Sequence, residues 1–567
     1  MRRSGGTGRS RAVVLAIVAA FSLAACTNSG PLPLVPSTPG MTVVPEPTLN
    51  EVVVGVDDVK GSYNPHTIAG QSTITTAMTS LLLPSVFRTA PDGTPKLDTT
   101  LMRGAQVTKT EPYTVSYTVR QDASWTDTAP IAAEDFVYLW QRMRSEAGVV
   151  DPAGYRLINN IASRDGGKVV EVTFSKPYPG WRSLFGNLLP AHLLKDLPGG
   201  WTSALADSFP ATGGPFAIKT LDQPRGEIVL ERNDRYWEQP TTLDRVVLRR
   251  AGQTDIVKAL RDKDDQAALI RADAIALNSV AELAKTAPLV SKPVPRPETV
   301  QVLLRPAAAQ MADLKVRQAV MAALDREALI ATGTGNGPSA QFRADAQVIP
   351  PSKPGYVPTM PPPNADPTTT ARLLGEAGYT RPDGGVWTRD GKPLNLTIAA
   401  AQGAEPYDKV ANQVQRQLAL AGIQSKVVSP SANQLFGQDL AGLPNADQSI
   451  DIAVVPQVDT GDSATTLAST FGCRPSIGDG AVTIPPNLSG FCDQTLQPTI
   501  DAAMSGQTLL SDALAKVEPV LWQQAVALPL FQVADLLVVL PEAQGADVGA
   551  PFAGPLSGSP TWRRERG

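Results

Sequence analysis

The sequence predicts a mixed α/β protein of more than one domain that is exported from the cell. Patterns typical of strands and of amphipathic helices alternate along the chain, and an apolar export signal stands at its start. About 520 of the 567 residues follow that signal and a proline-rich segment. Because a single core stops growing beyond ~250 to 300 residues, this length indicates at least two domains.

Residues 1–25 have the composition of a secretory signal peptide. Basic residues precede an apolar run at 12–20, which leads to the sequence LAAC at 23–26, typical of a lipoprotein processing site. The run is shorter than the ~20 residues that a membrane-spanning helix needs. We therefore expect cleavage before Cys26 and attachment of a diacylglycerol to its thiol. The alternative is an ordinary signal peptide with an incidental cysteine.

Residues 26–49 are rich in proline. The prolines alternate with small residues and valines, at Pro31, Pro33, Pro36, Pro39, Pro45 and Pro47. Such a composition favours extended polyproline conformations and cannot bury a core. We expect a lipidated tether that holds the folded body away from the outer face of the cytoplasmic membrane.

The first part of the body shows both kinds of periodicity. Residues 113–120 alternate between apolar and polar side chains and predict a strand, and Val170, Val172 and Phe174 repeat that pattern. Between them, an amphipathic helix is predicted by apolar residues spaced at i, i+3, i+4 and i+7, which are Phe136, Leu139, Trp140 and Met143. We expect this stripe to belong to the core.

A second α/β unit follows further along the chain. Asp366 is a predicted N-cap with Pro367 at the first helical position, and Gly378 is suited to end that helix in the left-handed conformation. A strand is then predicted at 394–398, a helix at 410–421 and a strand at 423–427. Strand, helix and strand joined by short loops indicate α/β architecture.

Charge and histidine content argue against several function classes. The chain has 50 basic and 54 acidic residues and a net charge of −4, so no electrostatic field favours nucleic acid. His66 and His192 are its only histidines, and neither supports a zinc spacing or a Ser-His-Asp triad. The glycine-rich run at 333–337 lacks the spacing of a phosphate-binding loop. We expect no catalysis, cofactor or metal, although a glycosidase-like carboxylate pair stays open.

Two cysteines remain besides Cys26. They are Cys473 and Cys492, and one even pair in an exported chain predicts a disulfide. Such a bridge stabilises the fold by roughly 3 kcal/mol, because it restricts the unfolded chain. A metal-binding pair is the alternative, but neither histidine lies near these cysteines in sequence.

Motifs spread over most of the mature chain resemble family 5 of the extracellular solute-binding proteins, which serve ABC importers of peptides and nickel. They are, in order, NP at 64–65, YTV at 113–115, WTD at 125–127, AAEDF at 132–136, PAH at 190–192, TGGPF at 212–216, RNDRYW at 232–237, VRQA at 316–319, LDR at 324–326 and ARLLGEAGY at 371–379. The resemblance implies a two-lobed, type II periplasmic-binding-protein fold with a ligand cleft between the lobes. It implies a first lobe at 50–296, completed by 512–567, and a second lobe at 297–511.

A closer resemblance is to a mycobacterial lipoprotein branch of this family. It is carried by LPSVFR at 83–88, WTDTAPIAA at 125–133, YLWQ at 138–141, GVVDPAGY at 148–155, LPAH at 189–192 and VEPVLW at 517–522. This resemblance implies a monomeric envelope lipoprotein that binds a mannosylated phosphatidylinositol, or a partner enzyme such as a membrane mannosyltransferase. It implies regulation of phosphatidylinositol mannoside and lipoarabinomannan synthesis. The alternative is the substrate-binding subunit of a peptide ABC transporter, with a peptide ligand and a permease partner.

The resemblance also indicates ligand-binding residues. In the peptide-binding members, an aspartate within a Trp-x-x-Asp-x-x-Asp run shortly before the disulfide takes the amino group of the peptide. Asp459 and Asp462 match this run, but Pro456 replaces the tryptophan, which argues against dipeptide binding. Asp459 is expected either to accept sugar hydroxyls or to be only a turn residue.

Two further candidates complete the expected site. Gln71 lies in a loop that resembles the one facing the ligand from the first lobe, and Arg343 is a candidate to neutralise an acidic ligand. A sugar site is expected to show aromatic platforms and several polar groups that bind hydroxyls, whereas a peptide site pairs an acid with a base across the cleft.

Overall fold

The computed structural model describes residues 49–59, 62–90, 93–361, 365–441, 449–474, 484–546 and 554–564. The predicted signal peptide, Cys26 and the tether up to residue 48 lie outside the described residues. Within the described ranges, no helix has both the length and the hydropathy needed to cross a membrane.

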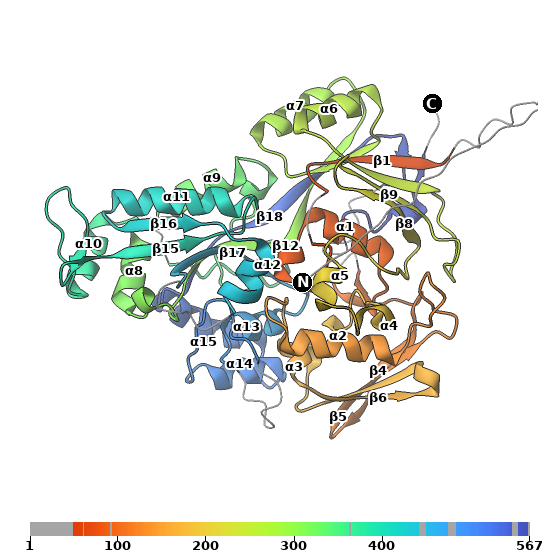
Figure 1. Cartoon of the computed structure of the whole chain (residues 1–567), viewed down its shortest axis with the longest axis horizontal. Helices are drawn as coiled ribbons and strands as arrows, with labels where there is room; N and C mark the ends of the chain where they lie inside the picture. Colours follow the sequence, from red (N-terminus) through yellow and green to blue (C-terminus); the bar gives the residue numbers. More distant parts are fainter. Residues whose placement is uncertain are drawn as a thin grey trace, which may run out of the picture. The chain divides into compact units, whose positions relative to one another are not determined.

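A ten-stranded mixed sheet runs through the body in the order β16-β15-β17-β12-β18-β11-β1-β10-β9-β8 (Figure 1). Its strands are β1 (Glu51–Val56), β8 (Phe216–Asp222), β9 (Glu227–Arg232), β10 (Arg245–Arg250), β11 (Ala267–Ile270), β12 (Val290–Leu304), β15 (Asn395–Ala399), β16 (Gln424–Val428), β17 (Ile452–Val458) and β18 (Ala527–Val539). Non-consecutive strands are neighbours throughout, so segments far apart in sequence build one sheet.

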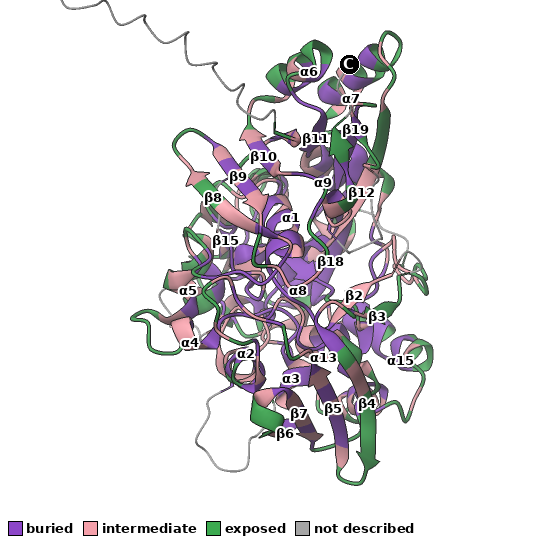
Figure 2. Ribbon diagram, turned by 90° about the vertical axis from the view of Figure 1, so that its right-hand side faces the viewer, coloured by how far each residue is buried: buried purple, intermediate pink, exposed green. Residues whose placement is uncertain are grey.

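The long strands β12 and β18 connect the two lobes. They pair antiparallel from Val290 opposite Val539 to Leu303 opposite Ala527, with a register shift between Pro295 and Thr299. One end of β18 also pairs with β11, whereas the other end of β12 pairs with β17. Every residue of β18 is buried, as Figure 2 shows, which explains its nearly continuous apolar sequence.

The first lobe, which contains β1 and β8–β10, carries a second sheet in the order β4-β5-β7-β6. Its strands are β4 (Met102–Thr110), β5 (Tyr113–Val119), β6 (Ile158–Arg164) and β7 (Val169–Phe174). Helix α2 (Ala133–Ser145) contacts β6 and β7 and buries Phe136, Leu139 and Met143. The predicted strands at 113–120 and 170–174 and the predicted helical core stripe are thereby confirmed.

Two short strands and six further helices of the described residues lie in the same half of the body. They are β2 (Phe87–Thr89), β3 (Pro95–Leu97), α1 (Thr73–Leu82), α3 (Ala153–Arg156), α4 (Ala191–Leu194), α5 (Gly200–Ala204), α6 (Gln253–Asp262) and α7 (Ala274–Ala284). Among them, α1 and α3 matter most for the site, because both lie beside the cleft described below.

The second lobe is the α/β unit built on β15–β17. Its helices include α8 (Leu314–Ala322), α9 (Arg326–Thr334), α10 (Pro367–Glu376), α11 (Tyr407–Leu420) and α12 (Ala432–Gln434), with the small hairpin β13 (Thr388–Arg389) and β14 (Lys392–Pro393). The Asp366 side chain caps α10 by accepting from the amide of Thr368, and Gly378 has a φ of 84°. The predicted helix signals and the parallel strand-helix-strand unit are confirmed.

Three helices and a disulfide complete the body. Helices α13 (Ser463–Phe471), α14 (Gln497–Met504) and α15 (Leu510–Gln523) share an apolar core with residues of the 348–356 loop. The structure joins Cys473 to Cys492, with their Cα atoms 4.6 Å apart, so the bridge links the end of α13 to the segment before α14. The short strands β19 (Ala543–Gln544) and β20 (Arg563–Arg564) pair antiparallel near the C-terminus.

Candidate ligand cleft

A cavity of about 650 Å³ lies where the two lobes meet. The first lobe contributes residues near α1 and residues of the 143–187 region, and the second contributes the 352–354 turn and the end of β17. A second cavity of about 440 Å³ adjoins it and shares Thr76, Thr79, Ser183 and Gly461 with it. Together they have the size of a site for a ligand larger than one amino acid or one sugar ring.

The lining of this cleft is rich in hydroxyl and amide groups. The larger cavity is lined by Thr75, Thr76, Thr79, Thr89, Thr94, Tyr155, Ser183, Ser352 and Thr460, with the amides Gln71 and Asn187. Gln71 follows a short 3-10 turn, and its Nε2 donates to the carbonyls of Pro65 and Thr67 at 2.8 and 3.0 Å. The side chain of Gln71 is therefore held in place at the wall of the cavity.

Asp459 lies at the second-lobe wall of the cleft and is already paired. The Lys353 Nζ lies 2.7 and 2.8 Å from its two carboxylate oxygens. The same ammonium donates at 2.8 Å to the carbonyl of Gly461 and at 2.8 Å to the Ser463 Oγ. These four oxygens use all the donor capacity of the ammonium, and only 17% of the Lys353 side chain is exposed. The turn is tightened further because the Gly461 amide donates to Asp459 Oδ1 at 2.8 Å.

Asp151, from the first lobe, contacts the turn that follows Asp459 and so joins the two lobes. Its Oδ2 accepts from the Thr460 amide at 2.9 Å and from the hydroxyls of Thr460 and Thr466, each at 2.8 Å. Burial, together with the charge of the nearby Asp459 carboxylate, raises the pKa of Asp151 to about 7. The cleft therefore contains a carboxyl that titrates near neutral pH.

Asp462 has a structural role at the start of α13. Its side chain caps that helix, with Oδ2 accepting from the Thr465 amide at 3.2 Å and from the Thr465 hydroxyl. It lines the adjoining cavity and not the larger one. A Cβ on Gly180 would lie 2.2 Å from the Asp462 carboxylate, so glycine is required at that contact.

Arg343 lies away from the cleft. Its guanidinium forms a bidentate ion pair with Glu327, and it lines neither of the two cleft cavities. The structure thus brings Gln71 and Asp459 to one cavity, puts Asp462 in the adjoining one, and puts Arg343 in a surface ion pair. Lys353 and Asp151 were not predicted from the sequence.

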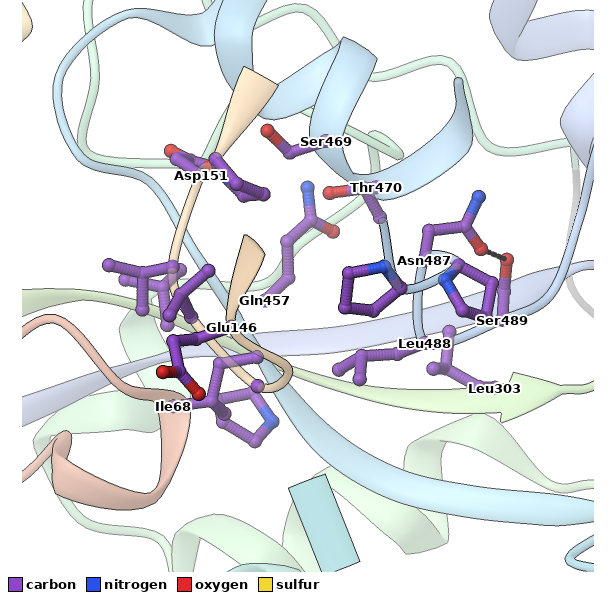
Figure 3. Close-up of a pocket in the computed structure, with 18 of the residues that line it drawn as sticks. Ile68, Glu146, Asp151, Leu303, Gln457, Ser469, Thr470, Asn487, Leu488 and Ser489 are labelled. Carbon is purple, nitrogen blue, oxygen red and sulfur yellow. Dashed lines mark hydrogen bonds between the residues drawn. The ribbon is translucent and has the colours of Figure 1, made fainter. Parts of the chain in front are cut away.

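A narrow third cavity of about 70 Å³ lies behind Asp151 (Figure 3). Asp151, Ser469 and Thr470 lie on one side of it, and Asn487 accepts from the Ser489 hydroxyl at 2.8 Å on the other. Pro456, the residue in the position of the family tryptophan, lines this cavity and not the larger cleft. The volume accommodates water-sized molecules and is too small for a sugar ring.

Comparison with known proteins agrees with this architecture. A model of "Bacterial extracellular solute-binding proteins, family 5 Middle" matches residues 106–475. The chain is 34% identical, over 97% of both chains, to the "Probable monoacyl phosphatidylinositol tetramannoside-binding protein LpqW" of Mycobacterium tuberculosis. It is 24% identical to the oligopeptide-binding protein OppA of Mycobacterium tuberculosis, over 84% of this chain and 79% of OppA.

Solved structures show the same fold. The oligopeptide-binding protein AppA of Bacillus subtilis, solved with a nonapeptide, matches with a TM-score of 0.70 at 18% identity, over 91% of this chain and all of AppA. The periplasmic EDTA-binding protein EppA matches with a TM-score of 0.70 at 22% identity, over 91% and 96% of the two chains. The two-lobed α/β fold with an interlobe cleft is thus established, and the chain belongs to family 5 of the bacterial extracellular solute-binding proteins.

Proposed function

We propose that this chain is a lipid-anchored envelope protein that binds a mannosylated phosphatidylinositol in its cleft and catalyses no reaction. In this proposal it regulates the synthesis of phosphatidylinositol mannosides and lipoarabinomannan, with a membrane mannosyltransferase as its partner. The relative at 34% identity, whose name describes it as binding monoacyl phosphatidylinositol tetramannoside, supports this class of ligand.

The contact between Lys353 and Asp459 carries the proposal. In the peptide-binding members that this chain resembles, the corresponding aspartate takes the amino group of the peptide. Here Asp459 already holds an ammonium that belongs to the protein, at 2.7 and 2.8 Å. A peptide would have to displace Lys353 from four oxygen ligands, and this competition disfavours peptides.

The remaining lining favours a ligand with many hydroxyl groups. Threonine and serine hydroxyls and the Asn187 amide both donate and accept hydrogen bonds, as sugar hydroxyls do, and the Gln71 carbonyl oxygen is left to accept. The tryptophan or phenylalanine platforms expected of a sugar site are not among the residues that line the larger cavity, so a sugar would be bound by hydrogen bonds more than by aromatic stacking.

A peptide importer subunit is the second candidate. The fold shared with AppA and the similarity to OppA favour it, and its partner would be an ABC permease. The two candidates differ in what the cleft binds. Native mass spectrometry of protein purified from its own envelope is therefore the direct test, because a retained glycolipid supports our proposal and a retained peptide supports the importer.

Lys353→Met tests the role of the internal ammonium. This change removes the charge with little loss of length and frees the Asp459 carboxylate. We expect tri- and tetrapeptides to bind the variant at least tenfold more tightly than the wild type, which is ~1.4 kcal/mol. Isothermal titration calorimetry measures this, and Lys258→Met, which changes an exposed lysine on α6, is the matched control.

The peptide affinities of the wild type and of Lys353→Met distinguish the glycolipid-binding function from the peptide importer. Equal, tight peptide binding by the wild type and by Lys353→Met would show that Lys353 does not block the site and would favour the importer. In the cell, deleting the gene is expected to change the ratio of polar phosphatidylinositol mannosides to lipoarabinomannan and to leave growth on peptides unchanged.

A further inference from the structure

A mainly apolar groove of about 470 Å³ lies next to the cleft, between α15 and the loop that precedes α10. One wall is a stripe on α15, formed by Leu510, Ser511, Leu514, Ala515 and Glu518, and the other consists of loop residues Ala346, Ile349, Val357 and Thr359. The spacing of i, i+4 and i+8 puts Leu510, Leu514 and Glu518 on one face of the helix. The groove is thus a built feature of the fold.

The groove keeps apolar surface in contact with solvent. Val357, in its wall, is 62% exposed, and Leu509, which directly precedes α15, is 71% exposed. Few large apolar side chains of the described residues are exposed to this degree, and Val357 lines the groove itself. Contiguous apolar surface of this kind marks a binding site for an apolar group.

Glu518 is the acidic residue that lines the groove, and its carboxylate is already hydrogen-bonded within the protein. Glu518 is buried, and its carboxylate accepts from the Gln347 amide at 3.2 Å and from the Thr359 hydroxyl. The Lys353 ammonium, at the other side, is turned to Asp459, Gly461 and Ser463. Its aliphatic stem is thus the part of this side chain left to border the groove.

The groove and the cleft are neighbours with a common wall. Lys353, Pro354 and Gly461 line both cavities. Gly461 carries no side chain, and a Cβ at this position would meet no atom within 4 Å. A ligand with a polar part in the cleft therefore has an apolar surface directly beside it.

We propose that this groove binds a single fatty acyl chain of the ligand whose glycan headgroup occupies the cleft. This inference rests on the proposed function and deepens it, because it assigns the glycan headgroup and one of the acyl chains of the glycolipid to two adjoining compartments. Each methylene moved from water into an apolar groove tightens binding about fourfold. Four buried methylenes therefore tighten binding by ~100-fold or more.

Ala515→Phe tests the assignment. Ala515 is exposed and lines the groove, so a phenyl ring there fills the groove from its open side without disturbing the core. Lys516→Phe is the matched control, since it puts the same ring at an exposed position of the same helix that does not line the groove. Binding of monoacyl phosphatidylinositol tetramannoside and of its deacylated glycan is measured by calorimetry for both variants and for the wild type.

We expect the wild type and Lys516→Phe to bind the acylated glycolipid at least 100-fold more tightly than the glycan. Ala515→Phe is expected to bind both with the affinity of the glycan. If deacylation does not weaken binding to the wild type, or if Ala515→Phe keeps the difference, the groove does not hold the acyl chain.

A third probe separates this inference from the proposed function. Palmitoyl lysophosphatidylcholine carries one acyl chain and no mannose. If it binds the wild type and Lys516→Phe but not Ala515→Phe, while neither mannoside binds, the acyl groove stands and the mannolipid function is overturned. If the glycan binds, but the acylated mannoside binds no more tightly than the glycan and the lysophospholipid does not bind, the proposed function stands. The assignment of the groove to an acyl chain is then wrong.

Discussion

Asp151 shows how burial and a like charge act on one carboxyl group. Burial, with a contribution from the nearby Asp459 carboxylate in the same direction, raises its pKa to about 7. The folded protein therefore holds this proton more tightly than the unfolded chain does. The resulting stabilisation is fully present below pH ~4 and is lost as the pH rises through about 7.

Asp151→Asn is expected to remove this pH dependence. The asparagine carbonyl still accepts from Thr460 and Thr466, but the side chain carries no charge above pH 7. The variant should be as stable as the wild type at pH 4 and more stable by at least ~1 kcal/mol at pH 8. Urea unfolding at a series of pH values measures the difference between the two proteins.

The difference in the free energy of unfolding between the wild type and Asp151→Asn reports on Asp151 alone, because the other titrating groups are the same in both proteins. Burial lowers the pKa of His66 to about 4, so stability is lost through His66 as the pH falls from 6.5 to about 4, in both proteins. The exposed Asp383→Asn serves as a control in which no such trend is expected. A difference between Asp151→Asn and the wild type that stays constant from pH 4 to pH 8 would contradict the argument.

At the same scale, the sequence predicted part of the site. Asp459 was found because it belongs to a short linear run that resembles the family pattern. Its partner Lys353 is 106 residues away along the chain, and Asp151 is 309 residues from Thr460. No local pattern records such contacts, since they exist only after the chain has folded and brought distant segments together.

Among the helices and strands, those in which apolar residues repeat with the period of a strand or a helix, or that carry a cap signal, were predictable. The strand β5, the stripe of α2 and the capped α10 each carry a local signal. The two central strands do not. Pro293, Pro295 and Pro297 argue against a strand in β12, and β18 is buried throughout and so lacks alternation. The predicted lobe boundaries at 296/297 and 511/512 stay predictions.

The disulfide belongs to this scale because it links the end of α13 to the segment before α14. Cys473 and Cys492 are 19 residues apart in sequence, so the bridge restricts a loop of that length in the unfolded chain. Cys473→Ser should lower the free energy of unfolding by roughly 3 kcal/mol. Urea unfolding without reductant measures this loss.

The double change Cys473→Ser with Cys492→Ser is the control for the remaining thiol and should match the single change. Reductant should lower the stability of the wild type and leave both variants unchanged. Two free thiols in wild-type protein taken from its envelope would rule out the bridge in the cell.

At the scale of the whole molecule, several contacts join the two lobes beside the cleft. The Ala153 amide donates to Ser469 Oγ at 3.2 Å, and the hydroxyls of Tyr178 and Thr465 lie 2.7 Å apart. Lys176 pairs with Asp501 at 3.0 Å. All of these contacts join residues within the body.

The position at which the described body begins leads to a prediction about anchoring. The first described strand, β1, begins at Glu51 and is paired on both sides, with β10 and β11, so the body is complete just after the predicted tether. Cys26→Ala should therefore shift the protein from the membrane pellet to the soluble fraction without lowering its melting temperature. Replacing 1–25 with a signal peptide that has an ordinary cleavage site, in the same variant, distinguishes an uncleaved signal from a second anchor. If the processed variant still sediments with membranes after a detergent-free wash, Cys26 is not what holds the protein there.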